Sequence, residues 1–361
     1  MLEIGGNIPY IKSNESVNCN DYTNNVFHFE FLHTVYTFSG RNAISIMLDS
    51  IDKSFDLVLL PSYTCKSCIT PFSEKGIEAK FYNINHDLTV NLESLKRLIS
   101  INKERNIILY VQTYFGFNTV AATKDMLQSF SSNKCILVED ITHSWLNQDH
   151  LEADFYICSF RKWLGISDGA AVGSNKFSLN TCNLNEKSRY DVFNKYSKAS
   201  ENKIRYLRGD LINKDDFNPL FKEISKDFCC SEIYSINSQS KKSILLTDFN
   251  QVISSRRRNA KYLLENINNK LIKPISKSLN NGVVPLYVPV YVSDDSRDKL
   301  QQYLFGKKIY CPIHWPVPSS ITEAEKQILY NHELSVVCDQ RYTLGDMKRI
   351  ADAINNFEVR I

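Results

Sequence analysis

Short apolar runs alternate with helical patterns through the first half of the chain. An apolar run bounded by turn residues predicts a strand, and apolar residues that recur every three or four positions predict a helix. By these rules helices are expected at 41–51, 65–76, 91–101 and 122–132, and strands at 56–63, 79–84, 106–115, 134–141 and 153–160. Strands separated by helices of about 10 to 15 residues indicate crossover connections. The pattern therefore predicts an α/β fold with a mostly parallel central sheet flanked by helices.

The second half of the chain has a different pattern. Residues 174–242 are rich in Asn, Lys and Asp and show weaker periodicity, and a long helical pattern follows at 245–267. The Asn- and Lys-rich segment 268–282 is predicted to be a loop or linker. A small α/β domain is then indicated by a strand at 284–292, a helix at 296–306, a strand at 308–315 and a closing helix at 343–357. We expect a large domain at 1–245, with an N-terminal arm, and a smaller C-terminal domain at 246–361.

The composition is that of a soluble globular protein, since 43% of the 361 residues are apolar and 23% are charged. The formal net charge of +3 is too small to indicate a nucleic-acid partner, and the densest basic run, Ser254–Tyr262, lies in a helical pattern where solvated arginines are expected. No apolar stretch is long enough to span a bilayer, and the N-terminus lacks the features of a signal peptide. We expect a cytoplasmic protein without nucleic-acid or membrane partners.

The cysteines indicate neither disulfides nor zinc. Ten cysteines in a chain without an export signal are expected to be reduced thiols. Cys65 and Cys68 form a CxxC, and Cys229 and Cys230 are adjacent. A structural zinc site needs a second closely spaced pair, which the sequence lacks. We therefore expect scattered, buried cysteines and no metal site.

Polar residues that follow the predicted strands are the candidates for chemistry, because ligands of parallel sheets bind beyond the carboxyl ends of the strands. Ser39 and Gly40 open a predicted helix, whose free N–H groups and positive dipole end suit a phosphate. Taken alone, Ser39 is better explained as a helix N-cap. Tyr63, Thr64 and Cys65 lie at the end of another predicted strand.

Asp140 lies near the end of the predicted strand 134–141 and is placed to bind a cation or a protonated ring nitrogen. Glu139 is expected to point to the opposite face, because side chains alternate along a strand. An ordinary surface acid is the alternative interpretation of Asp140. His143 follows within one helical turn and is either a ring-facing partner or a capping residue.

Ser159 and Lys162 follow the predicted strand 153–160 and bring a hydroxyl and an amine to one rim of the sheet. A lysine amine in a partly desolvated pocket can act as a nucleophile or a base. Taken alone, a serine three residues before a lysine is a weak signal, and a solvated lysine at a strand end is the ordinary interpretation.

A phosphate cradle, a carboxylate for a ring nitrogen and a Schiff-base lysine are the groups that pyridoxal phosphate requires, and they occur here in the order Gly40, Asp140, Lys162. The ordered set resembles the fold-type-I pyridoxal-phosphate enzymes and, more narrowly, the DegT/DnrJ/EryC1/StrS sugar aminotransferase family. The resemblance covers most of the chain from about Tyr36. It is strongest in SGRNAI (39–44), LLPSYT (59–64), LVEDITHS (137–144) and SFRKWLGISDGA (159–170).

The resemblance implies a role for each matching residue. Gly40 and Arg41 would offer backbone amides to the phosphate, which Ser159 would also contact, and Asp140 would pair with the pyridine nitrogen. His143 takes the position where the family has Gln or His near the cofactor. Lys162 would bind the cofactor covalently and carry the proton.

The sequence departs from the family pattern in three places. Cys65 stands where the family usually has an aromatic residue that stacks on the cofactor ring, and Tyr63 is the alternative for that role. Most members place the serine and the lysine five residues apart, whereas Ser159 and Lys162 are three apart, which indicates a divergent branch. The asparagine motif of the partner subunit is not recognisable, and Ser240 and Lys241 are the candidates near that place.

The C-terminal segment contains further candidates for substrate contacts. In many aminotransferases an arginine of the small domain binds the carboxylate of the amino donor, which its planar guanidinium suits. Arg341 is a candidate for this role, and a structural ion pair is the alternative. His314 and Trp315 either lie at the edge of the substrate pocket or pack within the small domain.

The resemblance implies a homodimeric, pyridoxal-phosphate-dependent aminotransferase. It would transfer an amino group from an amino acid, such as glutamate, to a keto sugar, expected to be a nucleotide-linked keto-deoxy sugar for surface polysaccharide. A lyase or dehydratase that uses the same cofactor is one alternative, although the family's sugar dehydratases replace the lysine with histidine. A non-catalytic regulatory or binding protein with this fold is another.

Overall fold

The chain forms two compact units. The computed structural model describes residues 3–11, 31–52, 54–210, 213–322 and 327–358. The first unit contains Met1–Gly6, Lys53–Asp154 and Phe249–Ile361, and the second unit contains Asn7–Asp52 and Phe155–Asp248. The domain boundary expected between residues 245 and 246 stays a prediction.

The first unit carries parallel strands of the central sheet. These are β3 (Leu57–Pro61), β4 (Glu78–Tyr82), β5 (Ile107–Gln112) and β6 (Cys135–Asp140). β3 pairs in parallel with β4 and β5, and β5 pairs in parallel with β6. Every residue of β3, β5 and β6 is buried, as expected for a parallel sheet that is covered on both faces.

The helices between these strands agree with the sequence pattern. They are α2 (Lys66–Glu74), α3 (Leu92–Ile101) and α4 (Lys124–Ser129), which follows the 3-10 turn Ala121–Thr123. Asn91 caps α3 by accepting a hydrogen bond from the Ser94 amide at 2.9 Å. The elements predicted between residues 56 and 141 are therefore confirmed, with small differences at their ends.

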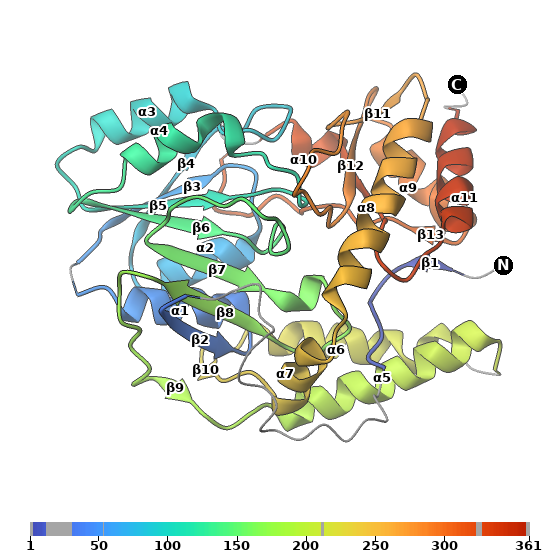
Figure 1. Cartoon of the computed structure of the whole chain (residues 1–361), viewed down its shortest axis with the longest axis horizontal. Coiled ribbons are helices and arrows are strands. Elements are labelled where there is room, and N and C mark those ends of the chain that lie inside the picture. Colours follow the sequence, from blue (N-terminus) through green and yellow to red (C-terminus); the bar gives the residue numbers. More distant parts are fainter. Residues whose placement is uncertain (1–2, 12–30, 53, 211–212, 323–326, 359–361) are drawn as a thin grey trace. The chain divides into compact units, whose positions relative to one another are not determined.

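The second unit contains β2 (His33–Thr37), β7 (Phe155–Ser159) and β8 (Ala170–Ser174), and α1 (Gly40–Asp49) follows β2. β8 pairs antiparallel with both β2 and β7. The strand order of the seven-stranded sheet is β2-β8-β7-β6-β5-β3-β4 (Figure 1). The predicted mostly parallel sheet flanked by helices is confirmed. The sequence pattern missed β8, because its Ala and Gly residues have low strand propensity.

The weakly periodic segment 174–242 contains well-formed elements. They are β9 (Leu184–Asn185), α5 (Tyr190–Arg208), the 3-10 turn Lys214–Asp216, α6 (Asn218–Asp227), β10 (Ile233–Tyr234) and most of α7 (Ser238–Leu245). The buried face of α5 includes Val192, Tyr196, Ala199 and Lys203, which recur every three or four residues. Lys203 makes this periodicity hard to recognise, because a lysine is not expected on a buried face. Its aliphatic stem is buried here while its amine donates to the Asn7 carbonyl at 2.6 Å.

The C-terminal part of the first unit contains a three-stranded antiparallel sheet in the order β11 (Ile272–Pro274), β12 (Val288–Val292), β14 (Glu333–Val336). Its helices are α8 (Phe249–Asn266), α9 (Arg297–Gly306), α10 (Leu329–His332) and α11 (Leu344–Asn355). β13 (Ile309–Tyr310) pairs in parallel with β1 (Ile4–Gly5). The strand, helix and strand expected between 284 and 315 and the closing helix are present.

Two expectations about this region are wrong. The segment 268–282 is not simply a loop, because it contains β11, where Ile272 is buried opposite Val292. Nor is the basic run of α8 fully solvated, because Arg256 is only 1% exposed. Its guanidinium donates to the Gln340 side chain at 2.8 Å and to the Leu286 carbonyl at 3.0 Å, and these contacts compensate for the loss of water.

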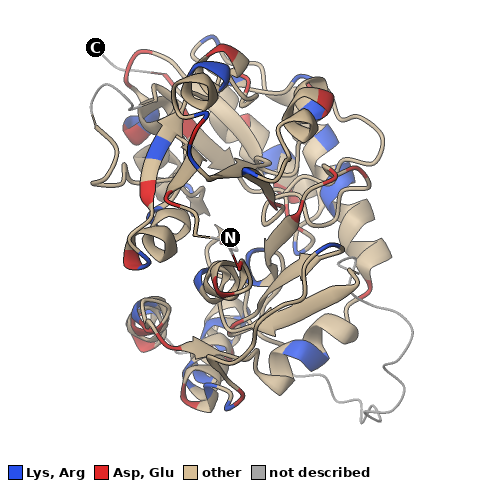
Figure 2. Ribbon diagram, turned by 90° about the vertical axis from the view of Figure 1, so that its left-hand side faces the viewer, with Lys and Arg blue, Asp and Glu red and all other residues tan. Residues whose placement is uncertain are grey.

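Among the residues that the structure describes, no helix has the length and apolar composition of a membrane span. Figure 2 shows basic and acidic residues interspersed along the ribbon. This distribution agrees with the small formal net charge of +3.

Candidate active site

Asp140 is buried at the end of β6, where the residue is 4% exposed. Its carboxylate accepts hydrogen bonds from the Tyr110 hydroxyl at 2.8 Å and the Thr142 amide at 2.9 Å. The Cys68 thiol lies 3.7 Å from the same oxygen that Tyr110 contacts. The surface-acid interpretation of Asp140 is therefore wrong, and the carboxylate is held by neighbours from β5, from α2 and from the residues directly after β6.

Tyr110 remains a hydrogen-bond donor to Asp140. Burial and the adjacent Asp140 carboxylate raise the pKa of Tyr110 well above its ordinary value. The phenol is therefore protonated at neutral pH and stabilises the charged form of Asp140. The sequence pattern did not single out Tyr110, which lies within an apolar strand and carries no motif of its own.

Glu139 points to the other face of the sheet, as predicted. Its carboxylate accepts hydrogen bonds from the Leu151 amide at 2.8 Å and the Thr113 hydroxyl at 3.1 Å. His150 lies 3.6 Å from it. Glu139 is thus satisfied by structural partners, and Asp140 is the acid that remains available to the candidate site.

His143 lies in an aromatic cluster of the first unit. Its ring stacks on Trp315, with centroids 5.6 Å apart, and meets His314 edge to face at 5.9 Å. Its Nδ1 accepts a hydrogen bond from the Phe115 amide at 3.3 Å. The Tyr63 ring also contacts Trp315, with centroids 5.2 Å apart. The fold thus brings together Tyr63, His143, His314 and Trp315, which the sequence analysis selected separately.

Glu333 is a buried acid of this cluster that the sequence analysis missed. Tyr63 donates a hydrogen bond to it at 3.3 Å, and the Ser335 hydroxyl donates at 2.5 Å. The same hydroxyl lies 2.8 Å from Nδ1 of His314. Tyr63 also donates to the His314 carbonyl. The only signal in the sequence is an acid at the start of an apolar strand, which by itself predicts a surface position.

Burial dominates the ionisation of Glu333 and raises its pKa to about 8. The hydrogen bonds from Ser335, the His314 amide and Tyr63 oppose this effect, because they favour the charged carboxylate. A carboxyl group that is protonated near neutral pH is therefore part of the aromatic cluster.

Cys65 is the N-cap residue of α2, and its side chain makes no capping hydrogen bond to the helix. Its Sγ lies 3.5 Å from that of Cys68. The preceding residue, Thr64, is fixed by two contacts with Tyr330, whose hydroxyl accepts from the Thr64 amide at 3.0 Å and donates to its carbonyl at 2.8 Å. The start of α2 is thereby attached to α10.

The second unit contains the start of α1. Ser39 is its N-cap and accepts a hydrogen bond from the Asn42 amide at 3.2 Å, which confirms the capping interpretation. A Cβ added to Gly40 would lie 3.9 Å from Cβ of Ser159, so these two predicted residues are neighbours. The Arg41 side chain donates a hydrogen bond to the Phe228 carbonyl at 2.5 Å, which is a structural contact within the second unit.

Lys162 ends the 3-10 turn Phe160–Lys162 that follows β7, and it is half-buried. Two main-chain hydrogen bonds hold this turn, from the Phe160 amide to the Gly169 carbonyl at 3.1 Å and from the Gly169 amide to the Phe38 carbonyl at 2.9 Å. Gly169 has a φ of +129°, a conformation that disfavours any side chain. The turn is therefore anchored on both sides of Lys162.

Asp168 is a further buried acid that the sequence analysis did not select. It accepts hydrogen bonds from the Asn237 amide at 2.8 Å and the Ser167 hydroxyl at 2.9 Å, and it also accepts from Ser240. Burial raises its pKa despite these donors. The network fixes the start of α7, on which the amine of Lys241 lies 5.4 Å from the centre of the Tyr36 ring.

Arg341 forms a two-point ion pair with Asp339, at 2.7 and 2.8 Å. Burial opposes the ionisation of Asp339, but the nearby charges of Arg341 and Arg256 outweigh this effect and lower the pKa of the Asp339 carboxyl. Arg341 therefore forms a structural ion pair, as the alternative interpretation expected. The contact of Arg341 with the carboxylate of an amino donor stays a prediction.

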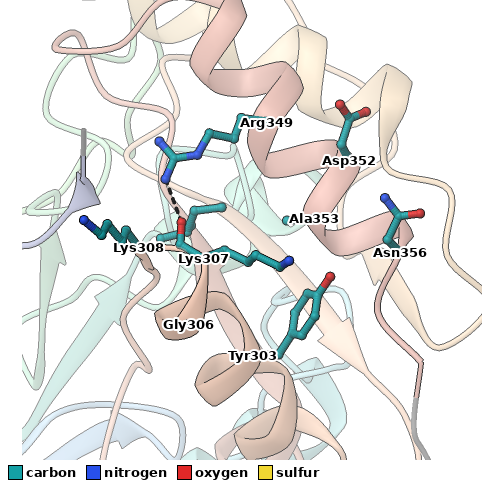
Figure 3. Close-up of a pocket in the computed structure, with 9 residues that line it drawn as sticks. Tyr303, Gly306, Lys307, Lys308, Arg349, Asp352, Ala353 and Asn356 are labelled. Atoms are coloured by element: carbon teal, nitrogen blue, oxygen red, sulfur yellow. Dashed lines mark hydrogen bonds between the residues drawn. The ribbon is translucent and has the colours of Figure 1, made fainter. Parts of the chain in front are cut away.

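A surface pocket of about 340 Å³ lies between the C-terminal parts of α9 and α11, within the first unit (Figure 3). Its lining includes Tyr303, Lys307, Lys308, Arg349 and Asp352. None of the predicted site residues lines it. The buried acids and the aromatic cluster, rather than this open pocket, therefore carry the candidate chemistry.

No protein-family profile and no curated protein matches the sequence of this chain. Solved structures match its fold. A DegT DnrJ EryC1 StrS aminotransferase from Brucella abortus is 15% identical, with 91% of this chain and 87% of the other covered and a TM-score of 0.62.

Further matches have similar scores. The putative sugar aminotransferase Spr1654 from Streptococcus pneumoniae, solved in a PLP form, is 13% identical, with 98% of each chain covered and a TM-score of 0.67. DesI, solved in the presence of its TDP-sugar product, is 14% identical, with 90% of this chain and 80% of the other covered and a TM-score of 0.62. The chain thus has the fold of the DegT/DnrJ/EryC1/StrS-type sugar aminotransferases.

Proposed function

We propose that this chain is a pyridoxal-phosphate-dependent sugar aminotransferase. The observation that carries the proposal is Asp140, a buried carboxylate at the end of β6 with the Tyr110 hydroxyl at 2.8 Å. A protonated ring nitrogen is a suitable partner for a buried carboxylate. The fold supports the proposal, because it matches Spr1654, a putative sugar aminotransferase solved in PLP and PMP forms.

The residues of the second unit suit the phosphate of this cofactor. The first N–H groups of a helix have no intrahelical partner, which leaves the amides of Gly40 and Arg41 for an anion. Ser159 is a neighbour of this helix start, because its Cβ would lie 3.9 Å from a Cβ at position 40. In this proposal Ser159 donates its hydroxyl to the phosphate, and Arg41 contributes its backbone only.

When bound, pyridoxal phosphate supplies an electron sink for the charge that develops on the substrate carbon. Asp140 would hold the proton on the ring nitrogen, and Tyr110 orients Asp140 by its hydrogen bond. The amine of Lys162 would bind the cofactor and would move a proton to and from the substrate carbon as a general acid and base. His143 would contact the cofactor, and Tyr63 or Cys65 would take the role of the family's stacking residue.

We further propose an amino acid such as glutamate as donor and a nucleotide-linked keto-deoxy sugar for surface polysaccharide as acceptor. DesI, which has this fold, was solved with its TDP-sugar product. His314 and Trp315 are supported as substrate contacts by their place beside His143, whereas Lys241 and Arg341 rest on the sequence alone. A cytoplasmic homodimer is part of the proposal.

The first test is the visible absorbance of the full chain mixed with pyridoxal phosphate. We expect a cofactor band that Lys162→Ala abolishes, because the lysine amine makes the covalent bond. Lys198→Ala, at an exposed position of α5, is the matched control and should keep the band. A wild-type chain that gives no band, or a band unaffected by Lys162→Ala, would contradict the proposal.

The second test separates amino transfer from other reactions of the cofactor. We expect glutamate or another common amino acid to convert the bound cofactor to its aminated form, and a keto sugar nucleotide to reverse the change. Lys162→Ala should lower the rate by about 100- to 10,000-fold, the usual contribution of a positioned acid and base. Failure with every common amino acid would favour a lyase.

A further inference from the structure

Cys65 and Cys68 form a close pair of thiols at the start of α2. Their sulfur atoms lie 3.5 Å apart, and the Cys68 amide donates to the Cys65 carbonyl at 3.1 Å. Both residues are thiols in the structure. A disulfide requires the sulfurs to approach to about 2.05 Å. Since the backbone already holds the two residues together, side-chain rotation can provide most of this approach.

The two thiols differ in environment. Cys65 is half-buried and occupies the N-cap of α2, where the positive end of the helix dipole favours a thiolate. Cys68 is buried. The hydrogen bond with Cys65, burial and the nearby charge of Asp140 raise the pKa of the Cys68 thiol well above its ordinary value. Cys65 is therefore the thiol that reacts first, and Cys68 stays protonated until its neighbour is modified.

We propose that Cys65 and Cys68 are a reversible modification site at which a low-molecular-weight disulfide forms an intramolecular disulfide. The Cys65 thiolate attacks one sulfur of the reagent, which forms a mixed disulfide and releases one thiolate. Cys68 then gives its proton to a released thiolate and attacks the Cys65 sulfur, so that the second reagent thiol leaves. Two protein thiols are oxidised, and one reagent disulfide is reduced to two thiols.

The disulfide changes the surroundings of Asp140. The Cys68 sulfur, 3.7 Å from the Asp140 carboxylate, loses the hydrogen that it can donate. The Tyr110 hydroxyl and the Thr142 amide remain as donors. The modification site therefore adjoins the proposed cofactor acid, but the disulfide itself forms whether or not the chain is an aminotransferase.

Oxidised glutathione is a suitable probe for the full chain. After incubation, alkylation of the remaining thiols and peptide mapping, we expect a disulfide between Cys65 and Cys68 that a reducing agent reverses. The Cys68→Ser variant should instead keep a stable glutathione adduct on Cys65, because the resolving thiol is missing. The Cys65→Ser variant should carry no adduct on Cys68, because this thiol is buried.

The exposed Cys182 supplies an internal control in the wild-type chain. A glutathione adduct on Cys182 shows that the reagent is active. The Cys182→Ser variant should still form the disulfide between Cys65 and Cys68. The proposal is overturned if Cys182 is modified while no disulfide joins Cys65 and Cys68. Since this comparison uses the wild-type chain, a variant that fails to fold does not decide the result.

Discussion

Among the single residues, Asp140 combines burial with hydrogen bonds from two donors to its carboxyl group. Tyr110 and the Thr142 amide donate to different oxygens of the group. These donors compensate for part of the water that the buried carboxyl group has lost. The remaining stabilisation is expected from the cation that the proposed cofactor supplies.

The Asp140→Asn variant tests this interpretation. The amide has almost the same shape but no charge, so it cannot hold a proton on the ring nitrogen. We expect the glutamate half-reaction to slow by on the order of 100-fold or more, the range for loss of one proton-positioning group. Single-turnover absorbance measures the rate, and thermal unfolding verifies the fold. An unchanged rate would remove Asp140 from the proposed chemistry.

Glu333 is a residue whose effect is expected in the pH dependence of stability. Its pKa is about 8 in the folded chain, against an ordinary value of 4.5. Between these values the unfolded chain is ionised at this position while the folded chain stays protonated, so rising pH favours unfolding. The contribution is fully present below about pH 4.5 and is lost as the pH rises through about 8.

The Glu333→Gln variant should remove this dependence, because an amide keeps the acceptor oxygen without titrating. We expect the free energy of unfolding of the wild type to fall relative to the variant between about pH 5 and 8. Urea unfolding at several pH values measures the difference. Parallel curves for the two proteins would show that Glu333 ionises normally. The other titratable or charged groups that face it are Tyr63, His314, Arg297 and Cys311.

At the scale of elements, α11 shows how local signals and packing agree. Thr343 is its N-cap and forms a capping box with Asp346. Met347, Ile350, Ala351 and Ile354 lie on the buried face of the helix. The spacing of these apolar residues predicted the helix, and the capping box sets where it begins.

Removal of this cap is expected to be measurable. Thr343→Ala leaves the Asp346 amide without its acceptor, and it should lower the free energy of unfolding by about 1 kcal/mol. Thr343→Ser keeps a hydroxyl at the same position and is the matched control. Urea unfolding measures both variants, and equal losses would rule out the cap as the cause.

Other elements could not be found from the pattern. β8 is too rich in small residues to look like a strand, yet it pairs on both sides, with β2 and β7. β11 is short and lies in a polar segment, and it forms only because β12 offers a partner. Strand pairing depends on neighbours that are distant along the chain, so local propensity does not reveal it.

At the scale of the whole molecule, the beginning of the chain belongs to the core of its C-terminal part. Ile4 is 1% exposed and is packed in a cluster with Ile309, Leu304 and Val336. β1 pairs with β13, and the Gly5 amide donates to the Tyr342 hydroxyl at 2.7 Å. A sequence-based division into successive domains does not anticipate such a contact.

The Ile4→Ala variant is expected to be destabilised although it lies near the chain terminus. Loss of a buried isoleucine side chain should lower the free energy of unfolding by about 2 to 5 kcal/mol. Ile11→Ala is the matched control, because Ile11 is 75% exposed and its truncation should change stability by less than about 0.5 kcal/mol. Similar unfolding midpoints for the two variants would show that β1 contributes little to the core.

The parallel strands β3 to β6 and the chemical types that follow them can be predicted from the sequence alone. Runs of apolar residues and helical spacing are local properties, so they are visible in one dimension. Asp140 and Glu139 are also distinguished by the sequence, because alternation along a strand places neighbouring side chains on opposite faces. Which distant groups meet depends on the tertiary structure: Tyr110 and Cys68 meet at Asp140, and Tyr63 meets Glu333. Burial of a polar group requires partners, and the fold alone determines which residues provide them.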